Sequence, residues 1–143
     1  MGPPILASLP RKRLPTLCLL LILIPLGLAT KLPIGFGASW VNNHLGGVIY
    51  EVFWCGLLAV LSPKLSTPKI VLTVFLITCF LEVMQVWAPP FLMAIRSTYP
   101  GHLVLGSSFD PFDFIDYALG CSLAGIWLNG QTRIQGSPSS LLT

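Results

Sequence analysis

Charged residues are scarce in this sequence: they make up 9% of its 143 residues, against about a quarter in soluble domains. Hydrophobic residues account for 54%, and the mean hydropathy is +0.81. This composition excludes an ordinary soluble domain and indicates a membrane protein. The formal net charge is +3, but the basic residues are spread over the connections between apolar segments, so nucleic acid is not an expected partner.

Cysteine and histidine are also few. The two histidines, His44 and His102, have no His-xxx-His spacing, and no CxxC pair accompanies them. We therefore expect no metal site and no cofactor. The four cysteines fall in four different apolar segments, as expected of small buried hydrophobic residues; they are Cys18, Cys55, Cys79 and Cys121.

Long apolar segments, by contrast, occupy most of the chain. A helix needs about 20 apolar residues to cross a membrane, and four segments approach that length: 14–30, 42–61, 68–87 and 111–129. They predict a single all-α domain over 1–143, an integral membrane bundle of four transmembrane helices. The connection 88–110 is too short to bury a core of its own, and 130–143 is expected to be a flexible tail. No soluble catalytic domain remains, so the chain is not predicted to be an enzyme.

The first apolar segment has two interpretations. Arg11-Lys12-Arg13 followed by LPTLCLLLILIPLGLA resembles a cleavable signal peptide, with a basic start and a small-residue end. The alternative is an uncleaved helix, kinked at Pro25 in a way that neighbouring membrane helices tolerate. The length of the run favours retention.

The basic residues predict the orientation of the bundle, because Lys and Arg in short loops stay on the cytoplasmic side. With four spans, one side carries Arg11, Lys12, Arg13, Lys64, Lys69 and Arg133. The other side carries only Lys31 and Arg96. Both termini are therefore predicted to be cytoplasmic, in a multi-pass protein.

Three of the five acidic residues are concentrated in SSFDPFDFIDYALG, residues 107–120. From the rise of a helix, Glu82 lies roughly 8 Å below the outer end of the third span, and Asp116 lies roughly as deep in the fourth. Glu51 lies deeper, roughly 13 Å into the second span and near the midplane. All five acids thus belong to the outer half of the protein.

These acids form polar stripes on two helices. Glu82 and Gln85 are three residues apart and share a face, as do Asp113 and Asp116. A carboxylate that faces lipid costs about 2.5–3.5 kcal/mol on insertion scales, so the stripes should face the bundle interior or a wet cavity. We expect the third and fourth spans to meet there, either around a ligand or in a structural polar clasp between the helices.

The remaining polar residues near this level have open roles. Asp110 before Pro111 predicts a helix N-cap, whereas Asp113 suits both capping and a site. Arg96 is the expected partner, either binding a carboxylate in bidentate fashion or holding a lipid phosphate; the alternative is a solvated loop arginine. Small-residue patterns at Gly120-Cys-Ser-Leu-Ala124, Gly125-Ile-Trp-Leu-Asn129 and Gly46-Gly47 favour close helix packing.

The order Glu82-xx-Gln85, Arg96, Asp113-xx-Asp116-Tyr-Ala-xx-Gly120, after a first helix with IPLGLA, resembles a small bacterial membrane family of unknown function, labelled ribosomal maturation YjgA-like. It is more distantly similar to VanZ-like proteins. The resemblance covers roughly residues 14–128. It implies a four-helix protein of the bacterial plasma (inner) membrane, in which the matching polar positions are Glu82, Gln85, Arg96, Asp113 and Asp116.

Several functions compete at this stage. The first is a non-enzymatic protein whose outer-side polar pocket binds a membrane lipid or cell-envelope headgroup through those five residues. A second is a small transporter or proton-linked subunit with Glu51 as a relay, because intramembrane carboxylates can carry protons. A membrane hydrolase or transferase with paired carboxylates and an assembly subunit with a membrane-protein partner complete the alternatives.

Overall fold

The computed structural model describes residues 13–31, 39–87, 89–106 and 108–136, which form helices and no strand. The six helices are α1 (Leu14–Ala29), α2 (Ser39–Leu61), α3 (Thr67–Trp87), α4 (Pro90–Arg96), α5 (Tyr99–Leu105) and α6 (Asp113–Gly136). The predicted all-α class is confirmed, and the four long helices coincide with the four apolar segments.

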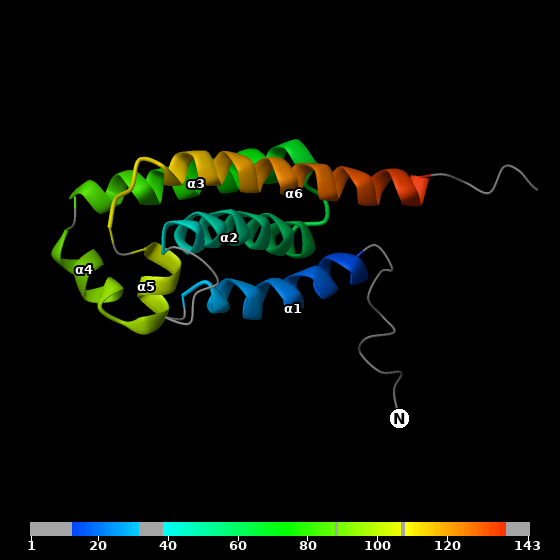
Figure 1. Ribbon diagram of the computed structural model, residues 1–143. Helices are drawn as coiled ribbons and strands as arrows, with labels where there is room; N and C mark the ends of the chain where they lie inside the picture. Colours follow the sequence, from blue (N-terminus) through cyan, green and yellow to red (C-terminus); the bar gives the residue numbers. More distant parts are fainter. Residues whose placement is uncertain (1–12, 32–38, 88, 107, 137–143) are drawn as a thin grey trace, which may run out of the picture.

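The four long helices lie side by side, and α4 and α5 cover one end of them (Figure 1). We call this the cap end. The start of α1, the α2–α3 connection and the end of α6 lie together at the opposite end, the terminal end (Figure 1). Helix α2 is central, because it packs against α1, α3 and α6.

Glycine allows α2 and α6 to approach closely. A Cβ atom at Gly120 of α6 would lie 2.5 Å from Cβ of Glu51, and one at Gly47 of α2 would lie 3.1 Å from Cβ of Asp116. The small-residue patterns predicted close helix packing, and the structure shows that α2 and α6 are the helices that pack there. Towards the terminal end, α2, α3 and α6 share an apolar core made of Cys55, Ile70, Val74, Cys121, Ala124 and Leu128.

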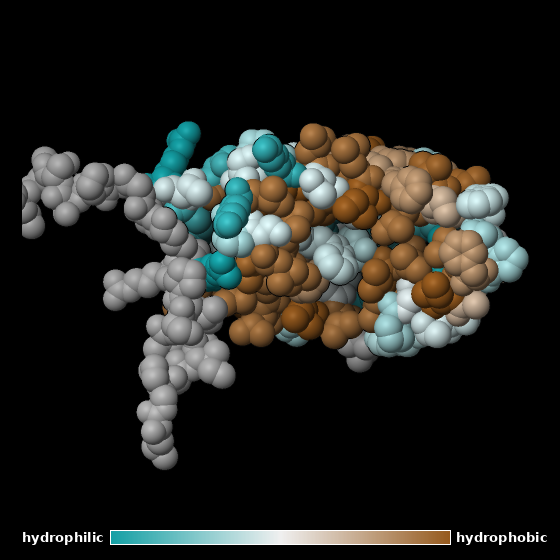
Figure 2. Space-filling view, turned by 180° about the vertical axis from the view of Figure 1, so that it is seen from behind, coloured by the Kyte–Doolittle hydropathy of each residue, from teal (hydrophilic) through white to brown (hydrophobic). Residues whose placement is uncertain are grey.

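Large apolar side chains cover much of the outside of the bundle. Hydrophilic side chains gather at its ends, and an apolar band lies between them (Figure 2). Exposed members of this band come from three helices: Leu21 and Ile22 of α1, Leu72, Leu76, Ile77, Phe80 and Val83 of α3, and Ile115, Leu119, Leu123 and Ile126 of α6. Apolar surface of this extent is typical of a face that meets lipid or another protein.

Two helices are long and apolar enough to cross a membrane: α2, over Asn42–Leu61, and α3, over Thr67–Trp87. Only 28% and 22% of their most apolar windows are buried inside the protein. Helix α1 is apolar but has 16 residues, and α6 has acids in its first turn. Length and composition thus identify two candidate spans, where the sequence predicts four.

Helix boundaries differ from the prediction mainly in the connections. The connection 88–110, for which no elements are assigned from the sequence, contains α4 and α5. The signal for α5 is Thr98, an N-cap whose Oγ1 accepts a hydrogen bond from the Gly101 backbone N–H, followed by a proline in the first turn. Helix α6 continues to Gly136, where a flexible tail is predicted, because backbone hydrogen bonds continue a helix irrespective of hydropathy. Residues 137–143 lie outside the described residues.

The buried thiols of Cys55 and Cys121 offer a test of the α2–α6 contact, since their Sγ atoms are 3.9 Å apart. Iodine, which is small and apolar, should oxidise this pair to a disulfide, because a small movement brings the sulfur atoms within bonding distance. Mass spectrometry of unreduced peptides should find this link in most molecules. The link should persist when Cys18 and Cys79 are both replaced by serine; a link involving either of these instead would contradict the helix arrangement.

Candidate functional site

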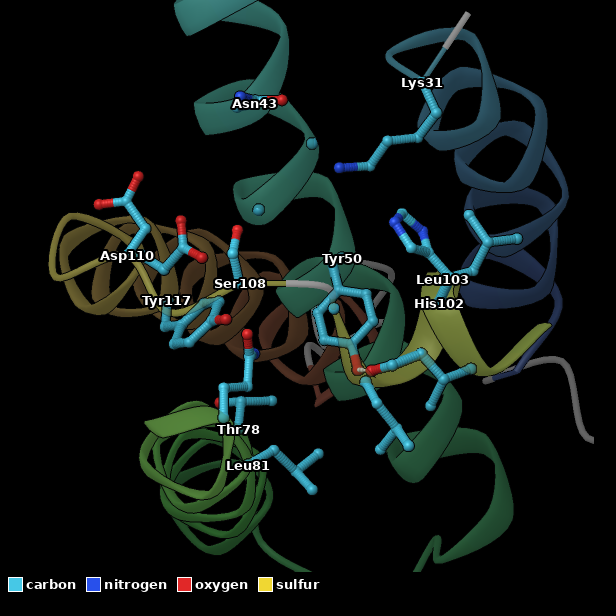
Figure 3. A pocket seen from close by; sticks show the side chains of 17 residues that line it. Lys31, Asn43, Tyr50, Thr78, Leu81, His102, Leu103, Ser108, Asp110 and Tyr117 are labelled. Carbon is cyan, nitrogen blue, oxygen red and sulfur yellow. Dashed lines mark hydrogen bonds between the residues drawn. The ribbon is translucent and has the colours of Figure 1, made fainter. Parts of the chain in front are cut away.

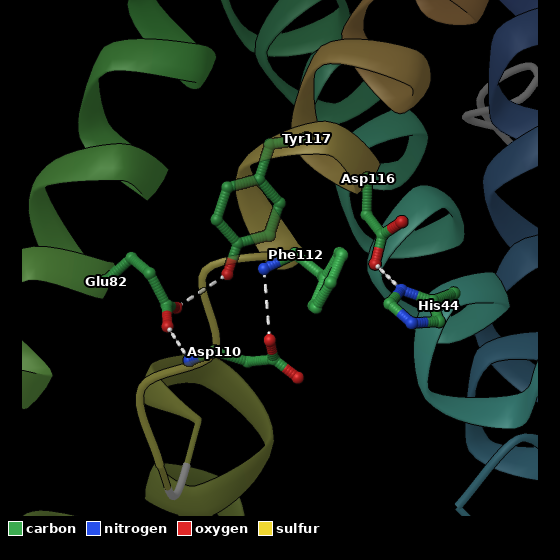
Figure 4. A network of polar contacts seen from close by, with 6 residues as sticks. All are labelled: His44, Glu82, Asp110, Phe112, Asp116 and Tyr117. Carbon is green, nitrogen blue, oxygen red and sulfur yellow. Dashed lines mark hydrogen bonds and ion pairs between the residues drawn. The ribbon is translucent and has the colours of Figure 1, made fainter. Parts of the chain in front are cut away.

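Glu82 holds the start of α6 against α3 (Figure 4). Its Oε1 accepts a hydrogen bond from the Asp110 backbone N–H at 2.9 Å. Its Oε2 accepts bonds from the Tyr117 hydroxyl at 2.9 Å and from Nε2 of Gln85 at 2.8 Å. The side chain is fully buried. Glu82 and Gln85 therefore share a helix face as predicted, and both oxygens of the Glu82 carboxylate accept hydrogen bonds from protein donors.

Asp116 pairs with a different helix. Its Oδ2 lies 2.6 Å from Nδ1 of His44 on α2 (Figure 4), and Asp116 is 4% exposed. Glu82 and Asp116 lie at the same end of the bundle, but each has its own set of partners. Sequence reasoning missed His44 as a site residue. The depth argument that matched Glu82 with Asp116 applies equally to His44, which stands near the start of the second apolar segment.

Asp113 completes a cluster with this pair. One ligand atom each from His44, Asp113 and Asp116 lie within 4.8 Å of one another. Asp113 and Asp116 are one helical turn apart on α6, and α2 supplies the histidine. Among the described residues, these three side chains form a group whose ligand atoms are close enough together to hold a metal ion.

A cavity of about 190 Å³ opens at the cap end beside this cluster (Figure 3). Side chains or backbone from α2, α3, α5 and the start of α6 line it. In Figure 3, Lys31 and Asp110 extend from opposite sides of the cavity. The Tyr50 hydroxyl lies at the α5 side, where it donates a hydrogen bond to the Val104 carbonyl at 2.6 Å. Its polar lining residues include Lys31, Asn43, Gln85, His102, Asp110 and Asp113.

The predicted ligand-binding residues are therefore distributed unevenly. Gln85 and Asp113 line the cavity, Glu82 lies behind Tyr117, and Asp116 faces His44. Arg96, the last residue of α4, is not among the described residues that line the cavity. Lys31 supplies the basic group there instead, because the end of α1 lies next to α2 at the cap end.

The two remaining acids, Asp110 and Glu51, lie outside the His44, Asp113 and Asp116 cluster. Asp110 Oδ1 accepts a hydrogen bond from the Phe112 backbone N–H at 3.0 Å, so Asp110 closes the turn that leads into α6. The helix itself begins at Asp113, two residues later than the start at Pro111 that the predicted N-cap requires. Glu51 is fully buried between α2 and α6, where its Oε2 accepts a hydrogen bond from the Cys121 thiol at 3.1 Å. The apolar core that contains Cys55 begins one helical turn further along α2.

Comparison with known protein families identifies a match for more than half of the chain. Residues 36–121 match the model of a family described as a protein of unknown function, DUF2809. This range includes α2 to α5 and the polar start of α6, and therefore His44, Glu82, Asp113 and Asp116. No curated protein and no solved structure matches the chain.

Proposed function

We propose that this chain, which belongs to the DUF2809 family of proteins of unknown function, is a multi-pass membrane protein. In this proposal its cap-end cavity binds the headgroup of a membrane or cell-envelope lipid. The observation that carries the proposal is the cavity itself. Its lining combines a lysine with two aspartates, at the end of a bundle whose flanks are apolar.

The membrane arrangement in this proposal has four spans, α1, α2, α3 and α6, with the terminal end in the cytoplasm. Basic residues of the described part support this orientation. Arg13, Lys64, Lys69 and Arg133 belong to the terminal end, whereas the cap end contains all the acids of the cavity. Because basic residues remain on the cytoplasmic side, the cavity would face the outer leaflet of a bacterial plasma membrane.

The lining indicates the chemistry of the headgroup. The Lys31 ammonium suits a phosphate oxygen, and the carboxylates of Asp110 and Asp113 suit an amine or hydroxyls. Exposed apolar side chains near the cap end, Leu45, Val104 and Phe109, offer contacts to acyl chains. A headgroup that combines an anionic phosphate with an amine or hydroxyl group, such as phosphoethanolamine, therefore fits the cavity.

Lipid binding can be tested with Lys31→Gln and Asp113→Asn. Native mass spectrometry of the protein extracted gently from membranes should show one enriched lipid class on the wild type. Each variant should lower its occupancy roughly tenfold or more, since a hydrogen bond to a charged group contributes about 1.5–3 kcal/mol. Lys64→Gln, a basic residue of the terminal end, is the matched control and should bind as the wild type does. Unchanged lipid occupancy in both cavity variants would refute the proposal.

A proton-linked carrier with Glu51 as a relay has less support. Glu51 is buried at the level where the polar residues end, and the residues that continue towards the terminal end form the apolar core. A path for protons requires polar groups or water on both sides of a relay. The lipid-binding proposal needs polar residues at the cap end alone.

A further inference from the structure

We propose that His44, Asp113 and Asp116 form a binding site for a first-row divalent metal ion, with Zn²⁺ as its best probe. The site lies where α2 and the first turn of α6 meet, next to the proposed headgroup cavity. This site is distinct from the headgroup site, because its ligand is a metal ion and because His44 and Asp116 do not line the cavity.

The spacing of the three side chains suits coordination. Zn²⁺ binds histidine nitrogen at about 2.0–2.1 Å and carboxylate oxygen at about 2.0–2.2 Å, so two ligand atoms on one ion lie up to roughly 4 Å apart. The three atoms here lie within 4.8 Å of one another. Asp113 and Asp116 are three residues apart and share one helix face. Small rotations of the carboxyl groups would bring all three atoms onto one ion.

Two of the ligands are already held in place by packing. Asp116 lies against Gly47, where a Cβ atom would approach its Oδ2 to 3.2 Å, so the α2 backbone fixes this carboxylate. The His44 ring stands edge-on to Phe112, with centroids 6.1 Å apart and an interplanar angle of 85°. Metal sites require ligands whose positions are fixed by surrounding contacts. Asp113, which is half-buried, is the adaptable third ligand.

The local charge also favours a cation. Asp110, Asp113 and Asp116 occur within seven residues, and Glu82 contacts the same segment. Glu82 is satisfied by three protein donors, whereas the Asp113 side chain accepts no hydrogen bond from a described residue. Among the basic side chains, Lys31 extends into the adjoining cavity. A divalent ion between Asp113 and Asp116 would offset the excess of negative charge.

The donor set selects the class of metal. Ca²⁺ and Mg²⁺ prefer oxygen ligands throughout, whereas one imidazole nitrogen with two carboxylates suits Zn²⁺, Mn²⁺ or Fe²⁺. Three protein ligands also leave a coordination position open, which is the arrangement of metal sites that bind a further group. Because Asp113 also lines the cavity, that position can reach a molecule held there.

The experiment is a Zn²⁺ titration of the full chain in lipid nanodiscs after removal of metals with a chelator. Calorimetry should show one Zn²⁺ bound per chain, and Mg²⁺ should not compete. His44→Gln and Asp113→Asn should each weaken binding roughly 10–100-fold or more, by analogy with the losses seen even for residues that only support ligands. His102→Gln is the matched control, a histidine from outside the cluster, and should bind Zn²⁺ as the wild type does.

Co²⁺ provides a second readout that separates this site from the cysteines. Its absorption spectrum should show nitrogen and oxygen ligands without a thiolate band, and the signal should disappear in His44→Gln. A thiolate band, or Zn²⁺ binding that survives both cluster variants, would overturn the proposal, as would no binding by a folded wild type. Lys31→Gln should lose lipid and retain Zn²⁺, so that failure of one proposal can be told from failure of the other.

Discussion

Replacing Glu82 by glutamine is expected to destabilise the protein by about 2–4 kcal/mol, because three donors depend on its two oxygens. The Asp110 backbone N–H approaches one oxygen, and the Tyr117 hydroxyl and the Gln85 amide approach the other. A glutamine offers one oxygen and one NH₂ group. An NH₂ group in place of Oε1 would leave the Asp110 backbone N–H without an acceptor. An NH₂ group in place of Oε2 would require the Tyr117 hydroxyl and the Gln85 amide to turn and accept, and in either case the charge that strengthens all three hydrogen bonds is lost. Thermal unfolding in nanodiscs, followed by circular dichroism, measures the effect.

Two controls separate hydrogen bonding from charge. Asp113→Asn removes a negative charge from the same end of the bundle but orphans no described donor, so its effect on stability should stay below about 1 kcal/mol. Tyr117→Phe removes one donor and should cost about 1 kcal/mol. Combined with Glu82→Gln, it should cost less than the sum of the two, since both changes break the same bond. A Glu82→Gln protein as stable as the wild type would show that Glu82 does not hold α6 against α3.

The depth of each polar residue in the bundle could be predicted from the sequence, but its rotation about the helix axis could not. Counting residues from the helix ends placed Glu82 and Asp116 at one end, and both lie there. Their partners depend on which face of α6 meets α2 and which meets α3. That is decided by the close contacts at Gly47 and Gly120, where three-dimensional packing fixes the rotation. For this reason His44 is not among the site residues predicted from the sequence.

The choice between the two basic residues of the cap end shows a second limit. Arg96 was predicted as the partner of the acids because it lies between the two acidic segments in the sequence. The connection that carries it folds into α4 and α5, and Arg96 ends α4 away from the cavity lining. Lys31, at the end of α1, lines the cavity instead. Short helices of seven residues give little periodicity to read, so the path of such a connection is not visible in the sequence.

Gly120→Ala is expected to destabilise the bundle by about 1–3 kcal/mol, the usual cost of overpacking a well-packed interface. The new methyl group would lie 2.5 Å from Cβ of Glu51 and 2.7 Å from the Val48 carbonyl oxygen. The carbonyl belongs to the α2 backbone, so the two helices must move apart. That movement also loosens the contact between Cys55 and Cys121. Iodine should therefore link these cysteines less completely in the variant than in the wild type.

Gly130→Ala is the matched control, because it makes the same change in the same helix at a position where a Cβ atom meets nothing within 4 Å. Alanine favours a helix over glycine by about 1 kcal/mol, so this variant should be as stable as the wild type or more stable. The same gain acts at Gly120, where the steric cost must exceed it. Two substitutions that differ only in position should thus change the unfolding temperature in opposite directions. If both substitutions raise the unfolding temperature, α2 and α6 do not cross at Gly120. The positions assigned to Glu51, His44 and Asp116 would then be wrong as well, because they depend on that crossing.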